Sequence, residues 1–273
     1  VYDAIVYSHE LALKFAKLQR ESFTDFEKEI TPGIFTGQKT IPVENAGCYV
    51  PAGRFPLVST VIMTVTPAVA AGVNNVIICT PPRVHPDDKV AAGKNGSGIP
   101  GNAFVGGKPY ADEGIMAAAY ICGVNHLYAV GGSQAIGAMA YGTESIQKVD
   151  VIVGPGNKYV NAAKKEVFGA VGIDMLAGPT EVLVIADESA NPAWVAADLL
   201  AQAEHDVVAQ PILVTTSVDF ANKVSDEIEK QLETLTTKTT ARQSIDNCGK
   251  IILVDSIEQA IEVANRRAPE HLE

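Results

Sequence analysis

One segment of the sequence runs from a buried-strand pattern through two glycines directly into a helical pattern. It is VIVGPGNKYV, residues 151–160. Glycines let a backbone approach a ligand closely, and the first turn of a helix offers free N–H groups to a phosphate. Tyr159 stands where a dinucleotide fingerprint has its third glycine, so an ordinary strand-to-helix turn is the alternative. Similar turns at 50–53 and 129–137 favour a dinucleotide crevice.

A second candidate is LLAQAEHD, residues 199–206, near the end of a predicted helix. Gln202 and His205 are three residues apart, so they project from one helix face and could share a metal ion. Histidine is a common zinc ligand, whereas glutamine is a poor one. On spacing alone, a single histidine near a helix end is more often a cap or a surface group.

The third candidate is RRAPEHLE, residues 266–273. Glu270 and His271 place a carboxylate beside an imidazole, and either group can act as an acid or a base near neutral pH if its pKa is tuned. Taken alone, the segment predicts the start of a helix, with Pro269 in the first position and Glu270 favoured by the helix dipole.

The elements that must position these residues alternate between strand and helix. An amphipathic helical pattern covers residues 1–28, followed by a break at 31–33 and a predicted turn at 37–39. The strands that follow are near-continuous apolar runs, as expected when both faces of a parallel sheet are covered. Seven strands are predicted, at 46–50, 75–79, 126–130, 150–153, 181–186, 211–215 and 250–255. Helical patterns follow them at 56–71, 110–123, 133–141, 157–169, 191–205, 218–235 and from 256 onward.

This alternation predicts an α/β protein with parallel sheets and helices on both faces. Seven strands exceed what one small doubly wound domain commonly holds, so we expect two α/β units. The Gly- and Pro-rich stretch 83–108 has no periodicity and predicts a long loop between a strand and its helix.

Composition excludes several classes of function. Lys and Arg number 21 against 32 Asp and Glu, a formal net charge of −11, which argues against nucleic acid as a partner. Apolar runs fall short of the roughly 18 residues that span a bilayer, so we expect a soluble chain with no membrane partner. Scattered cysteines without a CxxC pair, and the lack of a signal-peptide pattern, predict reduced thiols and a cytoplasmic location.

Read in order, these fragments resemble the histidinol dehydrogenase family. The resemblance covers most of residues 46–273, and its ordered motifs are YVPAG at 49–53, VGGSQAIGAMAYGTES at 130–145, VGPGNKYVNAAKK at 153–165, IDMLAGPTEVLVIAD at 173–187, DLLAQAEHD at 198–206 and APEHLE at 268–273. It implies a zinc-dependent homodimer that oxidises the amino alcohol histidinol to histidine through the aldehyde, with two NAD molecules as acceptors.

The resemblance also implies roles for residues of this sequence. One residue from each of the first three motifs would contact NAD: Tyr49, Gln134 and Asn157. Gln202 and His205 would be zinc ligands that also contact the substrate, and Thr180 of AGPTE would touch the substrate. His271 would remove the alcohol proton in the first oxidation, and Glu270 would activate water in the second.

The implied fold has two Rossmann-like parallel-sheet domains, one inserted in the other, with helices at the N-terminus. Residues 49–179 would form the inserted NAD-binding domain, and 1–48 together with 180–273 would form the domain that carries the zinc and acid–base residues. The chain begins at Val1 and reaches Glu273 within a helical pattern, so we expect trimming at both ends. The family's C-terminal region, which supplies an aspartate and a further histidine to zinc, would lie beyond Glu273.

Two alternatives stay open. Thr180 stands where many histidine-making members have serine, and Arg54 follows PAG, two features similar to the related sulfopropanediol dehydrogenases. A guanidinium matches the oxyanion geometry of a sulfonate, although a surface position is the commoner fate of an arginine. If the remaining zinc ligands were missing, the protein would belong to another class: a catalytically incomplete fragment or a dinucleotide-binding scaffold.

Overall fold

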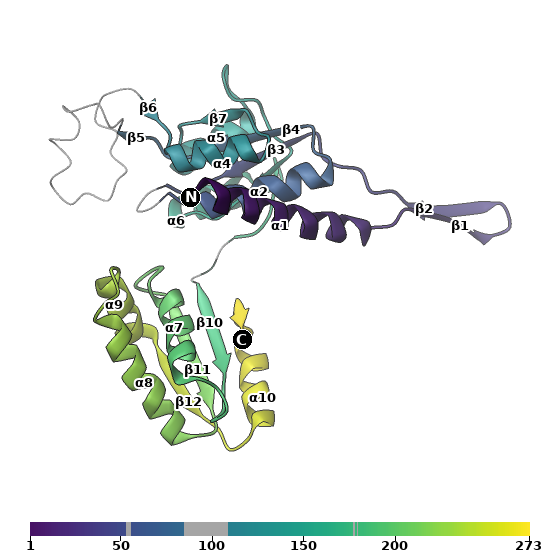
Figure 1. The fold of residues 1–273 in the computed structure, drawn as a ribbon. Coiled ribbons are helices and arrows are strands. Elements are labelled where there is room, and N and C mark those ends of the chain that lie inside the picture. The colour runs from purple at the N-terminus through teal and green to yellow at the C-terminus, as the bar shows by residue number, and fades with distance from the viewer. Residues whose placement is uncertain (53–55, 85–108, 177, 179) are drawn as a thin grey trace. The chain divides into compact units, whose positions relative to one another are not determined.

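The computed structural model describes residues 1–52, 56–84, 109–176, 178 and 180–273 (Figure 1). The chain divides into two compact units, Val1–Leu176 and Ala177–Glu273, which we call the first and the second unit. Among the described residues, no helix combines the length and the apolar character needed to cross a membrane.

The described part of the first unit is built on a five-stranded parallel sheet with the order β7-β4-β3-β8-β9. The chain starts at the central strand, adds two strands on one side, and returns to add two on the other. The order reverses between β3 and β8, the switch point at which open α/β sheets bind ligands. The strands are β3 (Asn45–Tyr49), β4 (Asn75–Cys79), β7 (His126–Tyr128), β8 (Val151–Val153) and β9 (Gly172–Ile173).

Helices cover both faces of this sheet because its strands are apolar on both sides. In β4, Val76 and Ile78 pack into one core, while Ile77 and Cys79 pack into the core on the opposite face. The first core is closed by α1 (Tyr2–Glu21), α2 (Val58–Ala71) and α4 (Glu113–Ile121), and the second by α5 (Gly132–Tyr141) and α6 (Lys158–Val167). The predicted two-sided covering is confirmed.

A hairpin that the sequence analysis did not predict follows α1. Its strands are β1 (Phe26–Thr31) and β2 (Ile34–Gln38), and every residue in them is exposed. The predicted break at 31–33 is the hairpin's turn, where Gly33 has φ +79°. The predicted turn at 37–39 is wrong, because Gly37 and Gln38 lie in β2, opposite Glu27 and Phe26.

The predicted loop 83–108 lies outside the described residues except for Arg83–Val84. These two residues form β5, which pairs with β6 (Pro109–Tyr110) in an antiparallel ladder. Arg54 also lies outside the described residues. All four cysteines are described and free, and three of them are buried. Burial raises the pKa of Cys48 and of Cys79 to about 12, so these thiols stay protonated.

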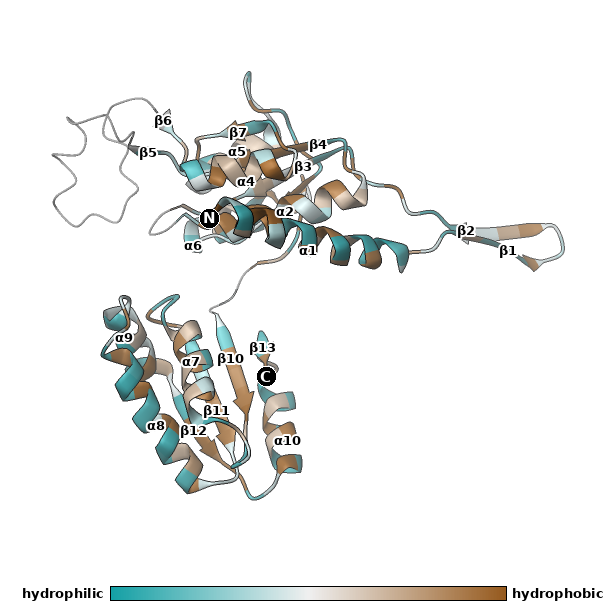
Figure 2. Ribbon diagram, viewed as in Figure 1, coloured by the Kyte–Doolittle hydropathy of each residue, from teal (hydrophilic) through white to brown (hydrophobic). Residues whose placement is uncertain are grey.

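The second unit holds a four-stranded parallel sheet with the order β12-β11-β10-β13. Its strands are β10 (Glu181–Ile185), β11 (Gln210–Thr215), β12 (Lys250–Leu253) and β13 (His271–Leu272). One face is covered by α7 (Pro192–Ala203), α8 (Val218–Leu232) and α9 (Lys238–Cys248), the other by α10 (Ile257–Arg267). Figure 2 shows hydrophobic residues along β10 and β11 between these layers.

Two predictions about the second unit need correction. The helix predicted to begin at Pro269 is absent: α10 ends at Arg267, Ala268 adopts a left-handed conformation with φ +47°, and His271 enters the sheet beside β10. For the same reason, the chain does not reach Glu273 within a helix. Helix α9 was not predicted, because only Ala241 and Ser244 of its eleven residues are buried and no apolar stripe marks it.

The proposed division of the chain into an inserted domain at 49–179 and a discontinuous domain stays a prediction. Its first boundary falls inside β3, whose residues Asn45–Tyr49 pair with β4 and β8. Helix α1 packs against α2 and α4, and its Ile5 lies in the same core as Val61 and Ile115.

Candidate functional site

Tyr49 links two glycine turns at the carboxyl edge of the first unit's sheet. It is the last residue of β3, and its buried hydroxyl accepts a hydrogen bond from the backbone N–H of Gly132 at 3.1 Å. Gly154 follows β8 so closely that a Cβ added to it would lie 2.2 Å from the carbonyl oxygen of Tyr49. Burial raises the pKa of Tyr49, an effect that the Gly132 hydrogen bond partly offsets, so the phenol stays neutral.

The helices that follow β7 and β8, α5 and α6, differ in how the backbone N–H groups of their first turns are hydrogen-bonded. In α6, the N-cap Asn157 accepts hydrogen bonds from Tyr159 N–H at 3.0 Å and Val160 N–H at 3.2 Å through its side-chain oxygen. In α5 the N-cap is Gly131, which has no side chain to do so. Among the described residues, the Gly132 N–H of α5 is already bonded to the Tyr49 hydroxyl, so the N–H groups of Ser133 and Gln134 are the donors of this first turn that remain for an anion. Gln134 lies exposed in this turn.

The structure brings together the glycine turns that the sequence analysis singled out, and it gives the predicted cofactor residues different surroundings. Tyr49 is buried and bonded to Gly132. Asn157 already uses its side-chain oxygen as a helix cap, which leaves its amide NH₂ group for a ligand. Their predicted contacts with NAD, and that of Gln134, stay predictions.

In the second unit, the predicted acid–base pair lies at the opposite edge, where the parallel strands begin. The Glu270 carboxylate accepts a hydrogen bond from the backbone N–H of Glu181, the first residue of β10, at 3.4 Å. His271 Nε2 lies 3.9 Å from Glu270 Oε1, and both side chains are about half exposed. Thr180 precedes β10, and its carbonyl oxygen accepts a hydrogen bond from the backbone N–H of Gln210.

Gln202 lies in the last turn of α7 (Pro192–Ala203), and His205 lies two residues beyond it, in the turn that leads to β11, so the two residues do not share a helix face as predicted. The Gln202 side chain is buried, and its Nε2 has no hydrogen-bond partner within the described ranges. His205 is exposed, and its backbone N–H donates to the carbonyl oxygen of Gln202. The C-terminal end of a helix carries partial negative charge, so this position suits a cation.

These two side chains are only part of a metal site. Where the structure describes the chain, it contains no cluster of three or more His, Cys, Asp or Glu side chains able to hold an ion. A catalytic zinc takes three protein ligands, commonly His, Cys or carboxylate, so Gln202 and His205 alone do not fit it. Zinc would need further ligands besides the described groups.

Sequence reasoning missed two ion pairs beside these candidate residues. Arg267, the last residue of α10, contacts the Glu181 carboxylate and donates to the Gln210 side-chain oxygen at 2.7 Å. Lys164 on α6 forms an ion pair with Asp174. A signal for Lys164 existed: it lies on the same helix stripe as the buried Val160 and Val167, where an apolar residue is expected.

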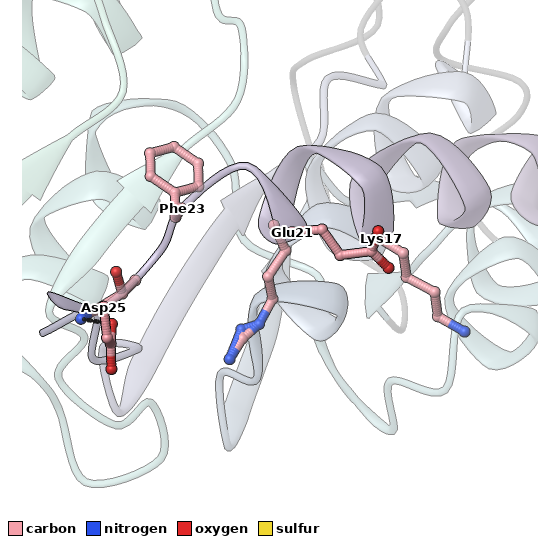
Figure 3. A pocket seen from close by; sticks show the side chains of 6 residues that line it. Lys17, Glu21, Phe23 and Asp25 are labelled. Atoms are coloured by element: carbon pink, nitrogen blue, oxygen red, sulfur yellow. Dashed lines mark hydrogen bonds between the residues drawn. The ribbon is translucent and has the colours of Figure 1, made fainter.

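A cavity of about 440 Å³ lies elsewhere in the first unit, between the end of α1 and the base of the β1–β2 hairpin (Figure 3). It contains none of the predicted site residues. Its lining mixes cations, carboxylates and an aromatic ring: Lys17, Arg20, Glu21, Phe23, Asp25 and Thr40. The mixed charge favours no single class of ligand.

A doubly wound parallel sheet with glycine turns at its carboxyl edge is an arrangement found in nucleotide-binding α/β proteins. The family model described as histidinol dehydrogenase matches residues 1–273. The histidinol dehydrogenase of Aquifex aeolicus (strain VF5) is 48% identical over 273 residues, which is 100% of this chain and 57% of that protein. That of Bacillus cereus (strain ATCC 10987 / NRS 248) is 48% identical over 257 residues, 94% of this chain and 54% of that protein.

The crystal structure of histidinol dehydrogenase from Elizabethkingia anophelis is similar to this fold, with a TM-score of 0.85 and 39% identity. The match covers 100% of this chain and 58% of that one. The chain belongs to the histidinol dehydrogenase family. It spans little more than half the length of the curated relatives it matches.

Proposed function

We propose that the protein oxidises L-histidinol to L-histidine through the aldehyde, as the last step of histidine biosynthesis. In balance, histidinol, water and two NAD⁺ give histidine, two NADH and three protons. The proposal rests on two sets of candidate residues, at the edges of two sheets, in a chain of this family. One sheet has glycine turns around Tyr49, and the other has the adjacent Glu270 and His271.

The acid–base roles follow from the chemistry of the two side chains. In the first oxidation, the neutral imidazole of His271 takes the hydroxyl proton of the alcohol while hydride leaves the carbinol carbon for the nicotinamide. In the second, the Glu270 carboxylate takes a proton from water, which attacks the aldehyde, and a second hydride leaves. The half-exposed side chains leave room for a substrate, and the Glu181 N–H holds one carboxylate oxygen.

NAD binding is assigned to the carboxyl edge of the first unit. The N–H groups of Ser133 and Gln134 in the first turn of α5 are the donors we assign to the pyrophosphate. Gly131 and Gly154 let the two turns pack closely against Pro81 and Tyr49. We assign Gln134 and the amide NH₂ of Asn157, whose side-chain oxygen caps α6, to orienting the cofactor.

We assign Gln202 and His205 to a zinc site that is completed by ligands besides the described residues, with Thr180 near the substrate. The partial negative charge at the end of α7 supports this assignment. We also propose a cytoplasmic homodimer. Free cysteines suit a reducing compartment, and exposed apolar side chains on α1 and the hairpin, such as Phe15, Leu18 and Phe35, suit an interface.

The test is NADH formation by the full-length protein with zinc and NAD, offered L-histidinol and sulfopropanediol in parallel. Two NADH formed per histidinol consumed is the expected result. Activity on the sulfonate alone would replace the substrate, and inactivity on both with NAD still bound would favour a dinucleotide-binding scaffold. Light scattering on the same sample tests the dimer, which a monomeric mass would contradict.

A further inference from the structure

A buried lysine lies beside the glycine turn that follows β8. Lys164 on α6 is 1% exposed. Burial of an ammonium group is costly unless its charge is paired and its protons are hydrogen-bonded. Lys164 meets both conditions, because its Nζ forms an ion pair with Asp174 and donates to the carbonyl oxygen of Gly154 at 3.1 Å. The lysine is therefore held against the turn itself.

Asp174 accepts a hydrogen bond from the backbone N–H of the same glycine, Gly154. Its Oδ2 accepts a hydrogen bond from Gly154 N–H at 2.8 Å, while its Oδ1 accepts one from Met175 N–H at 2.6 Å. Together, Lys164 and Asp174 fix both backbone polar groups of Gly154. This residue has φ +118°, a conformation that residues with a side chain rarely adopt. The pair thus holds a backbone geometry for which a glycine is needed.

The contacts continue from this turn to the second one. Gly154 lies against the carbonyl group of Tyr49, where a Cβ would come within 2.2 Å of the oxygen. The hydroxyl of Tyr49 accepts the hydrogen bond from Gly132 N–H, at the start of α5. One connected set of contacts therefore runs from the Lys164–Asp174 pair to both glycine turns at the carboxyl edge.

We propose that Lys164 and Asp174 are positioning residues for the dinucleotide. They hold the Gly154 turn, and through Tyr49 the Gly132 turn, in the geometry that receives the cofactor. The inference rests on the proposed function, which places NAD at this edge. Lys164 is too buried to touch the cofactor, so its effect is on cofactor affinity and not on the acid–base chemistry.

The test uses variants of the full-length enzyme loaded with zinc, measured by NADH fluorescence titration, steady-state kinetics and thermal unfolding. Lys164→Met and Asp174→Ala each leave one charge without its partner, and both lower the Tm. The double variant removes both charges, so its Tm recovers relative to the Asp174→Ala variant. Its Kd for NADH and its KM for NAD stay raised about tenfold, because Gly154 has lost two charge-assisted hydrogen bonds. Its kcat and its KM for the alcohol stay within about twofold of wild type.

A conservative variant separates positioning from folding. In Lys164→Met with Asp174→Asn, the amide oxygen can still accept from Gly154 N–H, so part of the NADH affinity returns without the ion pair. The matched control is Lys223→Met with Asp219→Ala, which removes an exposed ion pair on α8 and leaves NADH affinity and Tm unchanged.

Two results would overturn the inference, and they differ in what else they overturn. If the double variant binds NADH as wild type does, the pair serves only the stability of the fold, while the proposed function stands. If the wild-type protein does not bind NADH at all, the proposed function fails and the inference fails with it.

Discussion

The two parallel sheets of the described chain share the order of four strands. Each begins with a central strand, adds the next two strands of the sheet on one side and the following strand on the other, so β3, β4, β7 and β8 correspond to β10, β11, β12 and β13. Their candidate residues nevertheless lie at opposite edges. Tyr49 and Gly154 lie where strands of the first sheet end, whereas Glu181 and His271 lie where strands of the second begin.

The difference teaches that an edge of a parallel sheet selects the chemistry it can support. The carboxyl edge presents helix N-termini, whose free N–H groups and partial positive charge attract a phosphate. The amino edge presents helix C-termini, whose partial negative charge attracts a cation, and Gln202 and His205 lie at such an end. A repeated strand order thus provides two candidate sites of different chemistry.

The largest expected effect comes from the amino edge of the second unit. His271→Gln lowers kcat about 10²–10⁴-fold, because no group remains to take the alcohol proton. The Tm stays unchanged, since the side chain is half exposed. Glu270→Gln, its partner variant, releases aldehyde with one NADH per histidinol. A His271→Gln enzyme with wild-type kcat would remove this edge from the chemistry.

At the carboxyl edge of the first unit, Gly154→Ala is the strongest single change. Its Cβ meets the Tyr49 carbonyl oxygen and its φ is +118°, so we expect a loss of about 2–4 kcal/mol of stability together with loss of NADH binding. Denaturant unfolding and NADH titration measure the two effects. Gly169→Ala is the control: its φ is +99° with open space around it, so about 1–2 kcal/mol is lost and NADH binding is kept.

Gln202→Met tests whether the buried amide is kept for a ligand. Its Nε2 has no partner among the described residues, so an apolar isostere raises the stability of the metal-free protein by about 1–2 kcal/mol while bound zinc falls. Gln231→Met is the control, because the Gln231 Nε2 donates to the carbonyl oxygen of Ala193 at 2.8 Å and its loss destabilises the protein. Unchanged zinc content in Gln202→Met would remove this residue from the metal site.

The smallest effect concerns the turn that leads into Glu270 and His271. Ala268 is left-handed, with φ +47°, and its N–H closes α10 on the carbonyl oxygen of Ala264. Ala268→Gly relieves this strain, so we expect a gain of about 0.5–1 kcal/mol in unfolding experiments. A loss of stability would show that the alanine side chain contributes more than its backbone strain costs.

Seven of the parallel strands, β3, β4, β7, β8, β10, β11 and β12, could be predicted closely from the sequence, because a strand covered on both faces is a continuous apolar run. The predicted 75–79 and the observed Asn75–Cys79 agree for this reason. The short β13 could not be predicted, since its two residues become a strand only by pairing with Val182 and Leu183 of β10, far away in the sequence.

The residue types of the candidate sites could be predicted from the sequence, whereas the ion pairs beside them could not. Glycines and helix starts mark the carboxyl edge in the sequence itself. The pairing of Lys164 with Asp174, and of Arg267 with Glu181, depends on how strands and helices pack, which spacing along the chain does not encode.

The central claim is that the first sheet binds the dinucleotide at its carboxyl edge while the second sheet carries its candidate residues at its amino edge. Amide hydrogen exchange of the full-length protein, with and without saturating ADP-ribose, tests this claim most directly. ADP-ribose is the dinucleotide without its nicotinamide. We predict slower exchange of the amides at 131–134 and 154–160 and unchanged exchange at 180–182 and 270–272. Protection of the second pair of segments without the first would contradict it.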